Sequence, residues 1–148
     1  MTREGNCHCG AVRFTIDGPI RDVIICHCDA CRRATGGPWP ASAAYRRDLT
    51  VENDAALIWE RAAVSEFEAS RGRCRDCHTV VFWDAPERET VSFGAALVEG
   101  GGQLGVAAHI WVPDHERAAL GPIGVPVEPK GLPASVSVRW EGGDPTTG

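Results

Sequence analysis

The sequence lacks any apolar run approaching the roughly 20 residues that a membrane-spanning helix needs, which argues against an integral membrane protein. It also lacks an excess of positive charge: 15 lysines and arginines stand against 20 aspartates and glutamates, giving a formal net charge of −5. A protein that binds nucleic acid through its phosphates needs a basic face. We therefore expect neither a membrane nor a nucleic acid among its partners.

The first six residues, M-T-R-E-G-N, lack the apolar core of a secretory signal peptide. We therefore expect a cytoplasmic protein, and cytoplasmic conditions keep thiols reduced. The 7 cysteines of the chain would then be available as metal ligands. A disulfide framework would in any case leave one of the seven thiols unpaired.

Three cysteines lie within one short stretch, in the pattern C-x-C-x-x-C formed by Cys26, Cys28 and Cys31. Cys26 and Cys28 are too close in the chain for an unstrained disulfide. A metal ion needs only sulfurs about 2.3 Å from a common centre, which such a stretch can supply. Three thiolates fill three corners of a tetrahedron and leave the fourth open, which is typical of a catalytic rather than a structural zinc site.

The other four cysteines form two pairs, C-x-C at Cys7 and Cys9 and C-x-x-C at Cys74 and Cys77. Together they supply the four sulfurs that a closed structural zinc site needs. The cysteines thus divide into four and three with none left over, which predicts two zinc ions per chain. Scattered buried core cysteines are the alternative, but scattered residues would not fall into three tight clusters.

Two other prosthetic groups fit part of the pattern. Residues 74–78 spell C-x-x-C-H, the attachment motif of c-type haem. The only methionine is Met1, a poor axial ligand, and haem would leave five clustered cysteines unexplained. Four thiolates would also suit an iron–sulfur cluster, but C-x-C spacing in two places favours a single zinc ion.

Short stretches of alternating apolar and polar residues predict a mostly β protein of about nine strands. The expected strands are 11–17, 21–25, 39–46, 49–52, 57–61, 64–70, 79–83, 90–93 and 107–112. One short helix is expected at 29–35, with its free N–H groups towards the thiolates. Residues 113–148 hold 6 of the 10 prolines, so they should be mostly irregular, with a possible strand at 136–140. We expect one domain over 1–140 and a flexible tail over 141–148.

Two arginines, Arg32 and Arg33, directly follow the three-thiol stretch. Taken alone they could be a solvated surface pair, but beside an open metal position they are candidates for binding a substrate carboxylate. His8 and His27 each stand between two ligand cysteines, so we expect their side chains to point away from the sulfurs. His109, in an apolar strand, is either a satisfied core histidine or a catalytic candidate.

The stretches 5–14 and 26–36 resemble the glutathione-dependent formaldehyde-activating enzyme family, which also includes centromere protein V. The C-x-x-C pair, H-I-W-V at 109–112 and G-L-P at 131–133 are similar to further parts of that family. The resemblance implies a zinc-binding β-tent fold of several small antiparallel sheets with little helix. It implies a structural zinc at Cys7, Cys9, Cys74 and Cys77, and a second zinc with a free position at Cys26, Cys28 and Cys31.

The founding activity of that family joins glutathione and formaldehyde into S-hydroxymethylglutathione. The resemblance therefore implies a carbon–sulfur lyase acting on a small thiol adduct, with glutathione as the thiol. A zinc ion with three thiolates suits this chemistry, because it is a modest Lewis acid that readily binds one more soft ligand. The alternative is a zinc-stabilised binding module without catalytic activity.

Two departures from the family pattern stand out. His78 follows the C-x-x-C pair where the family usually has glycine, and residues 116–120 lack the family's usual aromatic residue. The first bears on the turn that holds the structural zinc. The second bears on the wall of the substrate pocket.

Overall fold

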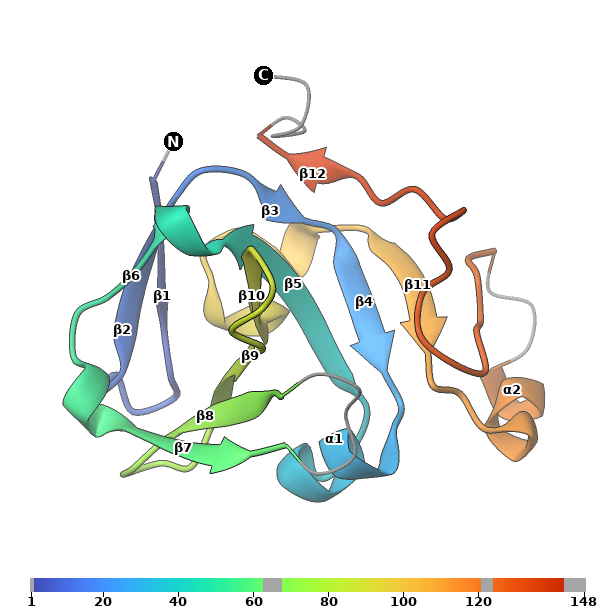
Figure 1. Cartoon of the computed structure of the whole chain (residues 1–148), viewed down its shortest axis with the longest axis horizontal. Coiled ribbons are helices and arrows are strands. Elements are labelled where there is room, and N and C mark those ends of the chain that lie inside the picture. Colours follow the sequence, from blue (N-terminus) through green and yellow to red (C-terminus); the bar gives the residue numbers. More distant parts are fainter. Residues whose placement is uncertain (1, 63–67, 121–123, 143–148) are drawn as a thin grey trace.

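The computed structural model describes residues 2–62, 68–120 and 124–142. These residues form a mostly β protein with two α-helices, α1 (Asp29–Thr35) and α2 (Asp114–Leu120), which confirms the predicted fold class. No helix among them is long and apolar enough to cross a membrane. Figure 1 shows α1 below the centre of the β structure and α2 at its right-hand edge.

The strands form two sheets. The smaller sheet has the order β1–β2–β6, with bounds Thr2–Asn6, Arg13–Asp17 and Leu49–Val51. The larger sheet contains the order β11–β4–β5–β10–β9–β8–β7, and β3 and β12 pair with each other beside β5. Its bounds are β3 Ile20–Arg21, β4 Val23–Cys26, β5 Trp39–Tyr45, β7 Leu57–Arg61, β8 Ser70–Cys74, β9 Val80–Asp84, β10 Thr90–Gly94, β11 Val106–Ile110 and β12 Trp140–Glu141.

Pairing between these strands is antiparallel, except that β11 runs parallel to β4. The 3-10 helices are η1 (Arg46–Asp48), η2 (Asp54–Ala56), η3 (Ala95–Leu97) and η4 (Gly101–Gln103). Most predicted strands are present within a residue or two.

Several local predictions were wrong. β1 and α2 were not expected, and β8 occupies residues read as a connection into Cys74. The stretch 113–120 was read as irregular because of the prolines beyond it, yet D-H-E-R-A-A-L is rich in helix formers. Of the possible strand at 136–140, only Trp140 is in a strand. Residues 64–67 of the predicted strand 64–70, and residues 143–148 of the expected tail, lie outside the described residues.

The main core lies between the two sheets and is built around three phenylalanines. The ring of Phe14 meets that of Phe82 edge-on at 4.9 Å between centroids, and that of Phe93 at 6.0 Å. All three side chains are almost fully buried. Packing Phe14 of the small sheet against the large sheet brings the turn after β1 towards β8, where the cysteine pairs lie.

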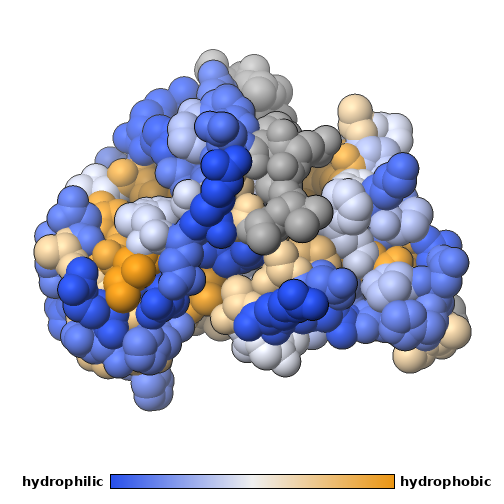
Figure 2. Space-filling model, turned by 60° about the horizontal axis from the view of Figure 1, so that its bottom comes forward, coloured by the Kyte–Doolittle hydropathy of each residue, from blue (hydrophilic) through white to orange (hydrophobic). Residues whose placement is uncertain are grey.

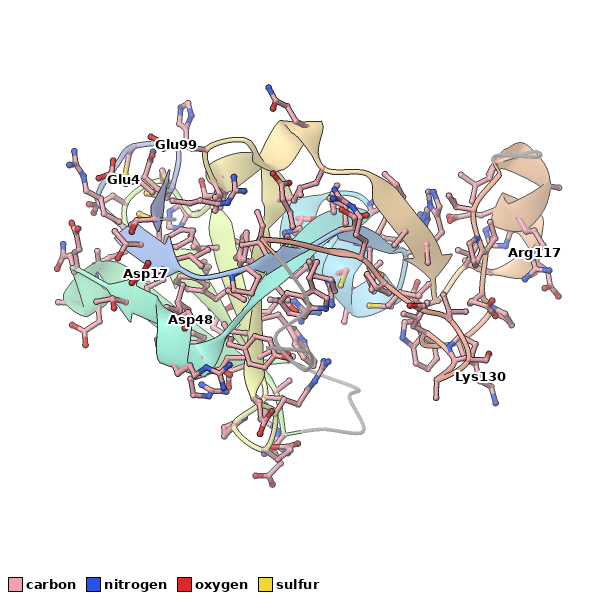
Figure 3. All side chains as sticks on the ribbon, turned by 90° about the horizontal axis from the view of Figure 1, so that it is seen from above. Glu4, Asp17, Asp48, Glu99, Arg117 and Lys130 are labelled. Atoms are coloured by element: carbon pink, nitrogen blue, oxygen red, sulfur yellow. The ribbon has the colours of Figure 1, made fainter. Side chains whose placement is uncertain are left out.

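Charged side chains lie around this core. Figure 3 shows Glu4, Asp17, Asp48 and Glu99 towards one end of the molecule and Arg117 and Lys130 at the other. On the face shown in Figure 2, hydrophilic residues cover most of the surface and apolar residues form small separate patches.

Gly5 provides a first test of this packing. It pairs with Phe14 across β1 and β2, and the Phe14 ring lies where a Cβ atom at position 5 would be. We expect Gly5→Ala to lower the free energy of unfolding by about 1–3 kcal/mol, because the ring must move within a packed core. Chemical denaturation measures the change. Gly102→Ala is the control, because nothing lies within 4 Å of its added Cβ; equal destabilisation by both variants would contradict the prediction.

Candidate metal centres

Four sulfurs meet where the turn after β1 lies against the turn between β8 and β9. The Sγ atoms of Cys7, Cys9, Cys74 and Cys77 all lie within 4.8 Å of one another. The Cys7–Cys9 and Cys9–Cys74 sulfur pairs are each 3.7 Å apart. Sulfurs about 2.3 Å from a tetrahedral centre lie about 3.8 Å from each other, so this donor set fits a zinc ion.

Backbone N–H groups support this four-sulfur group. The N–H of Val12 donates to Cys7 Sγ at 3.3 Å, and that of Asp76 donates to Cys74 Sγ at 3.4 Å. Each of these two sulfurs thus accepts a hydrogen bond from the turn that carries it. His78 has φ 63°, in the left-handed region that glycine adopts most readily. Its Nδ1 lies 2.8 Å from Arg73 Nη1. With this φ angle, histidine makes the turn at the position where the family usually has glycine.

The other three sulfurs gather at the junction of β4 and α1. Cys26 ends β4 and pairs with Trp39 of β5, while Cys28 is the N-cap of α1 and Cys31 lies in its first turn. Their sulfurs lie within 4.8 Å of one another, and no other Cys, His, Asp or Glu of the described residues joins the group. Cys28 Sγ accepts the N–H of Cys31 at 3.3 Å, so the sulfur that would bind metal also caps the helix.

Arg71 brings a positive charge to this three-sulfur group. It lies on β8, 40 residues from Cys31 in the chain, and its Nη2 donates to Cys31 Sγ at 3.5 Å. Hydrogen bonds from the thiols of Cys26 and Cys31 lower the pKa of Cys28 to about 2, and the charge of Arg71 acts in the same direction. Hydrogen bonds to Cys28 and Cys31 raise the pKa of Cys26, and the pKa of Cys31 is raised as well, so without a metal the group favours one thiolate, at Cys28. No motif pointed to Arg71, beyond its place three residues before a cysteine.

Arg32 and Arg33, the predicted carboxylate contacts, lie on different sides of α1. The Arg32 Nε donates to the carbonyl oxygen of His27 at 2.9 Å, and its Nη2 is paired with the Glu116 carboxylate of α2. Arg33 is exposed to solvent. The charge of Arg32 is thus already met within the chain, and its contacts hold the three-sulfur loop against α2.

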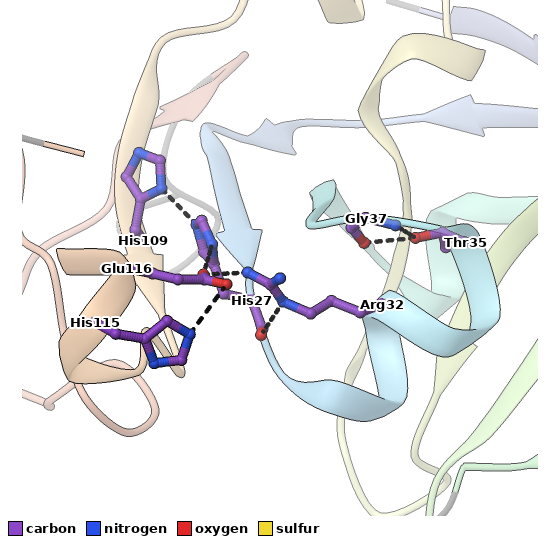
Figure 4. Close-up of polar contacts among 7 residues, drawn as sticks. All are labelled: His27, Arg32, Thr35, Gly37, His109, His115 and Glu116. Carbon is purple, nitrogen blue, oxygen red and sulfur yellow. Dashed lines mark hydrogen bonds and ion pairs between the residues drawn. The ribbon is translucent and has the colours of Figure 1, made fainter. Parts of the chain in front are cut away.

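The buried side chain of His27 lies in a partly buried polar cluster (Figure 4). Its Nε2 is 2.8 Å from Nδ1 of His109, and its Nδ1 is 3.4 Å from the Glu116 carboxylate. Burial, together with the neighbouring His27, lowers the pKa of His109. As expected from its place between two cysteines, His27 points away from the sulfurs. Glu116 lies in the stretch that lacks the family's aromatic residue, and the sequence did not indicate its contacts.

A mainly apolar groove of about 320 Å³ begins at the end of α1. It is lined by the end of α1, the start of β5, residues 78–80 and η3. Trp39 and Val80 line it and also pack in one cluster with Cys31, so the groove adjoins the three-sulfur group.

Comparison with known proteins agrees with this geometry. Residues 2–114 match the family model for the glutathione-dependent formaldehyde-activating enzyme. A protein of Halomonas elongata, named as a candidate enzyme of this kind, is 33% identical over 70 residues, which cover 47% of this chain and 41% of the relative. The match thus spans less than half the length of that relative.

A solved structure has a similar fold. The crystal structure of a Rhodobacter sphaeroides protein superposes with a TM-score of 0.54 at 26% identity, covering 84% of this chain and 98% of that one. Residues 2–114, which match the family model, contain both cysteine groups. The chain therefore belongs to the glutathione-dependent formaldehyde-activating enzyme family.

Proposed function

We propose that this protein is a zinc-dependent carbon–sulfur lyase that joins a small thiol to formaldehyde or a related aldehyde, and releases them in reverse. The observation that carries the proposal is the three-sulfur group with a positive charge beside it. Glutathione is the thiol proposed, in keeping with the family. The reaction adds the thiol sulfur to the aldehyde carbon and the thiol proton to the aldehyde oxygen, so no oxidant is needed.

The residues of the chain divide this work between them. Cys26, Cys28 and Cys31 would hold one zinc ion, which lowers the pKa of a fourth sulfur ligand and so favours a nucleophilic thiolate. Arg71, which donates to Cys31 Sγ, would offset part of the negative charge of a fourth thiolate at this group. The other four cysteines would hold a second zinc with a structural role, because four sulfurs leave it no open position.

Metal content is the first test. We expect gently purified protein to contain two equivalents of zinc per chain, because the two sulfur groups are separate and each fits one ion. Elemental analysis by mass spectrometry, with parallel counting of free thiols, measures this. One equivalent that cannot be raised by added zinc, or iron with visible absorbance, would contradict the two-zinc scheme.

Thiol binding tests the proposed reaction directly. In cobalt-substituted protein, a fourth sulfur at the three-sulfur site strengthens the thiolate-to-metal absorption, so we expect glutathione to raise it. S-methylglutathione, which has no thiolate to give, should leave it unchanged. If millimolar thiols of every kind leave the spectrum unchanged, the protein is a zinc-stabilised binding module and not a lyase.

A further inference from the structure

The carboxylate of Glu116 joins α2 to the segment that carries the three-sulfur group (Figure 4). Its Oε2 atom is paired with Nη2 of Arg32 and lies 3.4 Å from Nδ1 of His27. The Nε of Arg32 also donates to the carbonyl oxygen of His27 at 2.9 Å, which closes a ring of three contacts. The side chain of Glu116 is 21% exposed, so solvent screens these charges only in part.

The two partners of Glu116 lie on either side of sulfur ligands. His27 stands between the first two cysteines of the group, and Arg32 directly follows the third. One carboxylate therefore contacts both ends of the segment, although it lies 84 positions from Arg32 along the chain. If this carboxylate were lost, both ends would be released together.

The position of α1 depends on such polar contacts, because little of the helix is buried. The helix supplies Cys31 and, at its N-cap, Cys28, whereas Cys26 belongs to β4. Cys31 is the only buried residue of α1. Apolar burial therefore contributes little to fixing the helix, and polar contacts have a large share in setting its position relative to β4. That position determines whether the three sulfurs meet at one point.

The burial of His27 gives a second reason for the carboxylate. The side chain is 5% exposed, and its Nδ1 has no hydrogen-bond partner among the described residues. A buried polar nitrogen without a partner is unfavourable, and the negative charge of Glu116 at 3.4 Å lies directly beside it. The other ring nitrogen, Nε2, lies 2.8 Å from Nδ1 of His109 on β11. The imidazole is thus held between β11 and α2.

The family match does not account for Glu116. The residues that match the family model end at position 114, and the family's usual aromatic residue is missing from 116–120. In this chain the same stretch carries a carboxylate that reaches the segment of the three sulfurs. This departure from the family pattern therefore coincides with a contact that bears on the metal centre.

We propose that Glu116 is a positioning residue for the zinc ion of the three-sulfur group: by holding His27 and Arg32, it keeps the three sulfurs converged on one point. The inference rests on the proposed function for the presence of zinc there. Glu116 is not itself among the residues that could bind the ion. It acts through the geometry of the ligands, as groups that orient metal ligands do in other proteins.

The test is competition for zinc with a coloured chelator, which measures the affinity of each site. Glu116→Gln keeps the size of the side chain but removes its charge. It should weaken zinc binding at the three-sulfur group by about 10- to 100-fold and leave the four-sulfur group within about twofold of its original affinity. Glu116→Asp, which keeps the charge on a shorter side chain, should lose less.

The two sites are told apart with Cys31→Ser, which leaves only the four-sulfur group complete. Adding Glu116→Gln to Cys31→Ser should leave the remaining zinc affinity unchanged. Equal weakening at both sulfur groups would show a general structural effect and would overturn the proposal, as would unchanged affinity at the three-sulfur group.

A cobalt spectrum separates positioning from a loss of fold. At saturating cobalt, Glu116→Gln should alter the absorption of the three-sulfur site, because the ligand geometry changes, while the far-UV circular dichroism stays the same. An unaltered spectrum would contradict a positioning role.

Arg32→Gln tests the route by which Glu116 acts. If Glu116 holds the segment through Arg32, the double variant should lose less zinc affinity than the product of the two single losses, because both changes break one contact. Losses that multiply fully would mean that the two residues act independently, which contradicts the proposal.

Asp114→Asn is the matched control, because it removes the same charge from an exposed side chain in the first turn of the same helix. It should leave zinc binding at both sulfur groups unchanged. Weakening at the three-sulfur group as large as that of Glu116→Gln would mean that any negative charge on α2 suffices, and would overturn the assignment to Glu116.

The outcomes also separate this inference from the proposed lyase function. If Glu116→Gln weakens zinc binding at the three-sulfur group alone while no thiol changes the cobalt spectrum of the unaltered protein, the positioning role stands and the lyase function fails. If thiols change that spectrum but Glu116→Gln binds zinc as tightly as the unaltered protein, the lyase proposal stands and the positioning role fails.

Discussion

Cys77→Ser is expected to yield insoluble or poorly folded protein. Cys77 completes the four-sulfur group, in which the Cys9 and Cys74 sulfurs lie 3.7 Å apart although 65 residues separate them in the chain. A structural zinc contributes about 10–16 kcal/mol of apparent binding energy in small zinc domains, and a serine hydroxyl is a poor replacement for a thiolate. Losing several kcal/mol is a large part of the roughly 5–15 kcal/mol that stabilises an ordinary domain.

Cys31→Ser provides the comparison, because all three ligands of the other group come from one short segment. It should give folded protein with one zinc ion. Far-UV circular dichroism, soluble yield and zinc content distinguish the two variants. Equal loss of structure in both would mean that the division into a structural and a working site is wrong.

Cys28→Ser is expected to abolish thiol–aldehyde turnover while the fold survives. Serine can keep the N-cap hydrogen bond that Cys28 now accepts from the Cys31 N–H, since serine is among the best N-cap residues. It cannot replace the thiolate as a soft ligand. Removing the metal should lower the rate by three orders of magnitude or more. A Lewis acid lowers the activation barrier by several kcal/mol, and each 1.4 kcal/mol changes the rate about tenfold.

Cys28→Ala separates the two roles of this sulfur. It removes both the ligand and the cap, so it should cost about 1 kcal/mol more in unfolding free energy than Cys28→Ser, with the same loss of turnover. Activity assays with glutathione and formaldehyde, and denaturation curves, measure both effects. Substantial turnover in Cys28→Ser, at one zinc ion per chain, would show that the chemistry does not take place at this group.

The parts of the site that the sequence predicts are those encoded by local spacing. The cysteine clusters, the helix at 29–35 and the strand leading to Cys26 all follow from patterns a few residues long. Arg71 and Glu116 could not be found in this way, because their contacts with Cys31 and Arg32 join residues 40 and 84 positions apart. Only the pairing of β8 with β9 and the docking of α2 bring them to the loop.

The difference between local patterns and contacts of distant residues also explains why β1 was not predicted. Its sequence, T-R-E-G-N, is polar and contains a glycine, so no alternation of apolar residues marks it as a strand. It forms because Arg3 and Gly5 pair with Ile16 and Phe14 of β2, and because the glycine leaves room for the Phe14 ring.

The spacing of the two sulfur groups has a kinetic consequence for metal uptake. Three sulfurs within six residues can capture an ion in an unfolded or newly made chain, because closing so short a loop is fast and costs little entropy. The four-sulfur group forms only after residues 65 positions apart have met, which requires the sheets to pack first. During refolding with limited zinc, we therefore infer that the metal enters the working site first, while the ion that stabilises the fold arrives last.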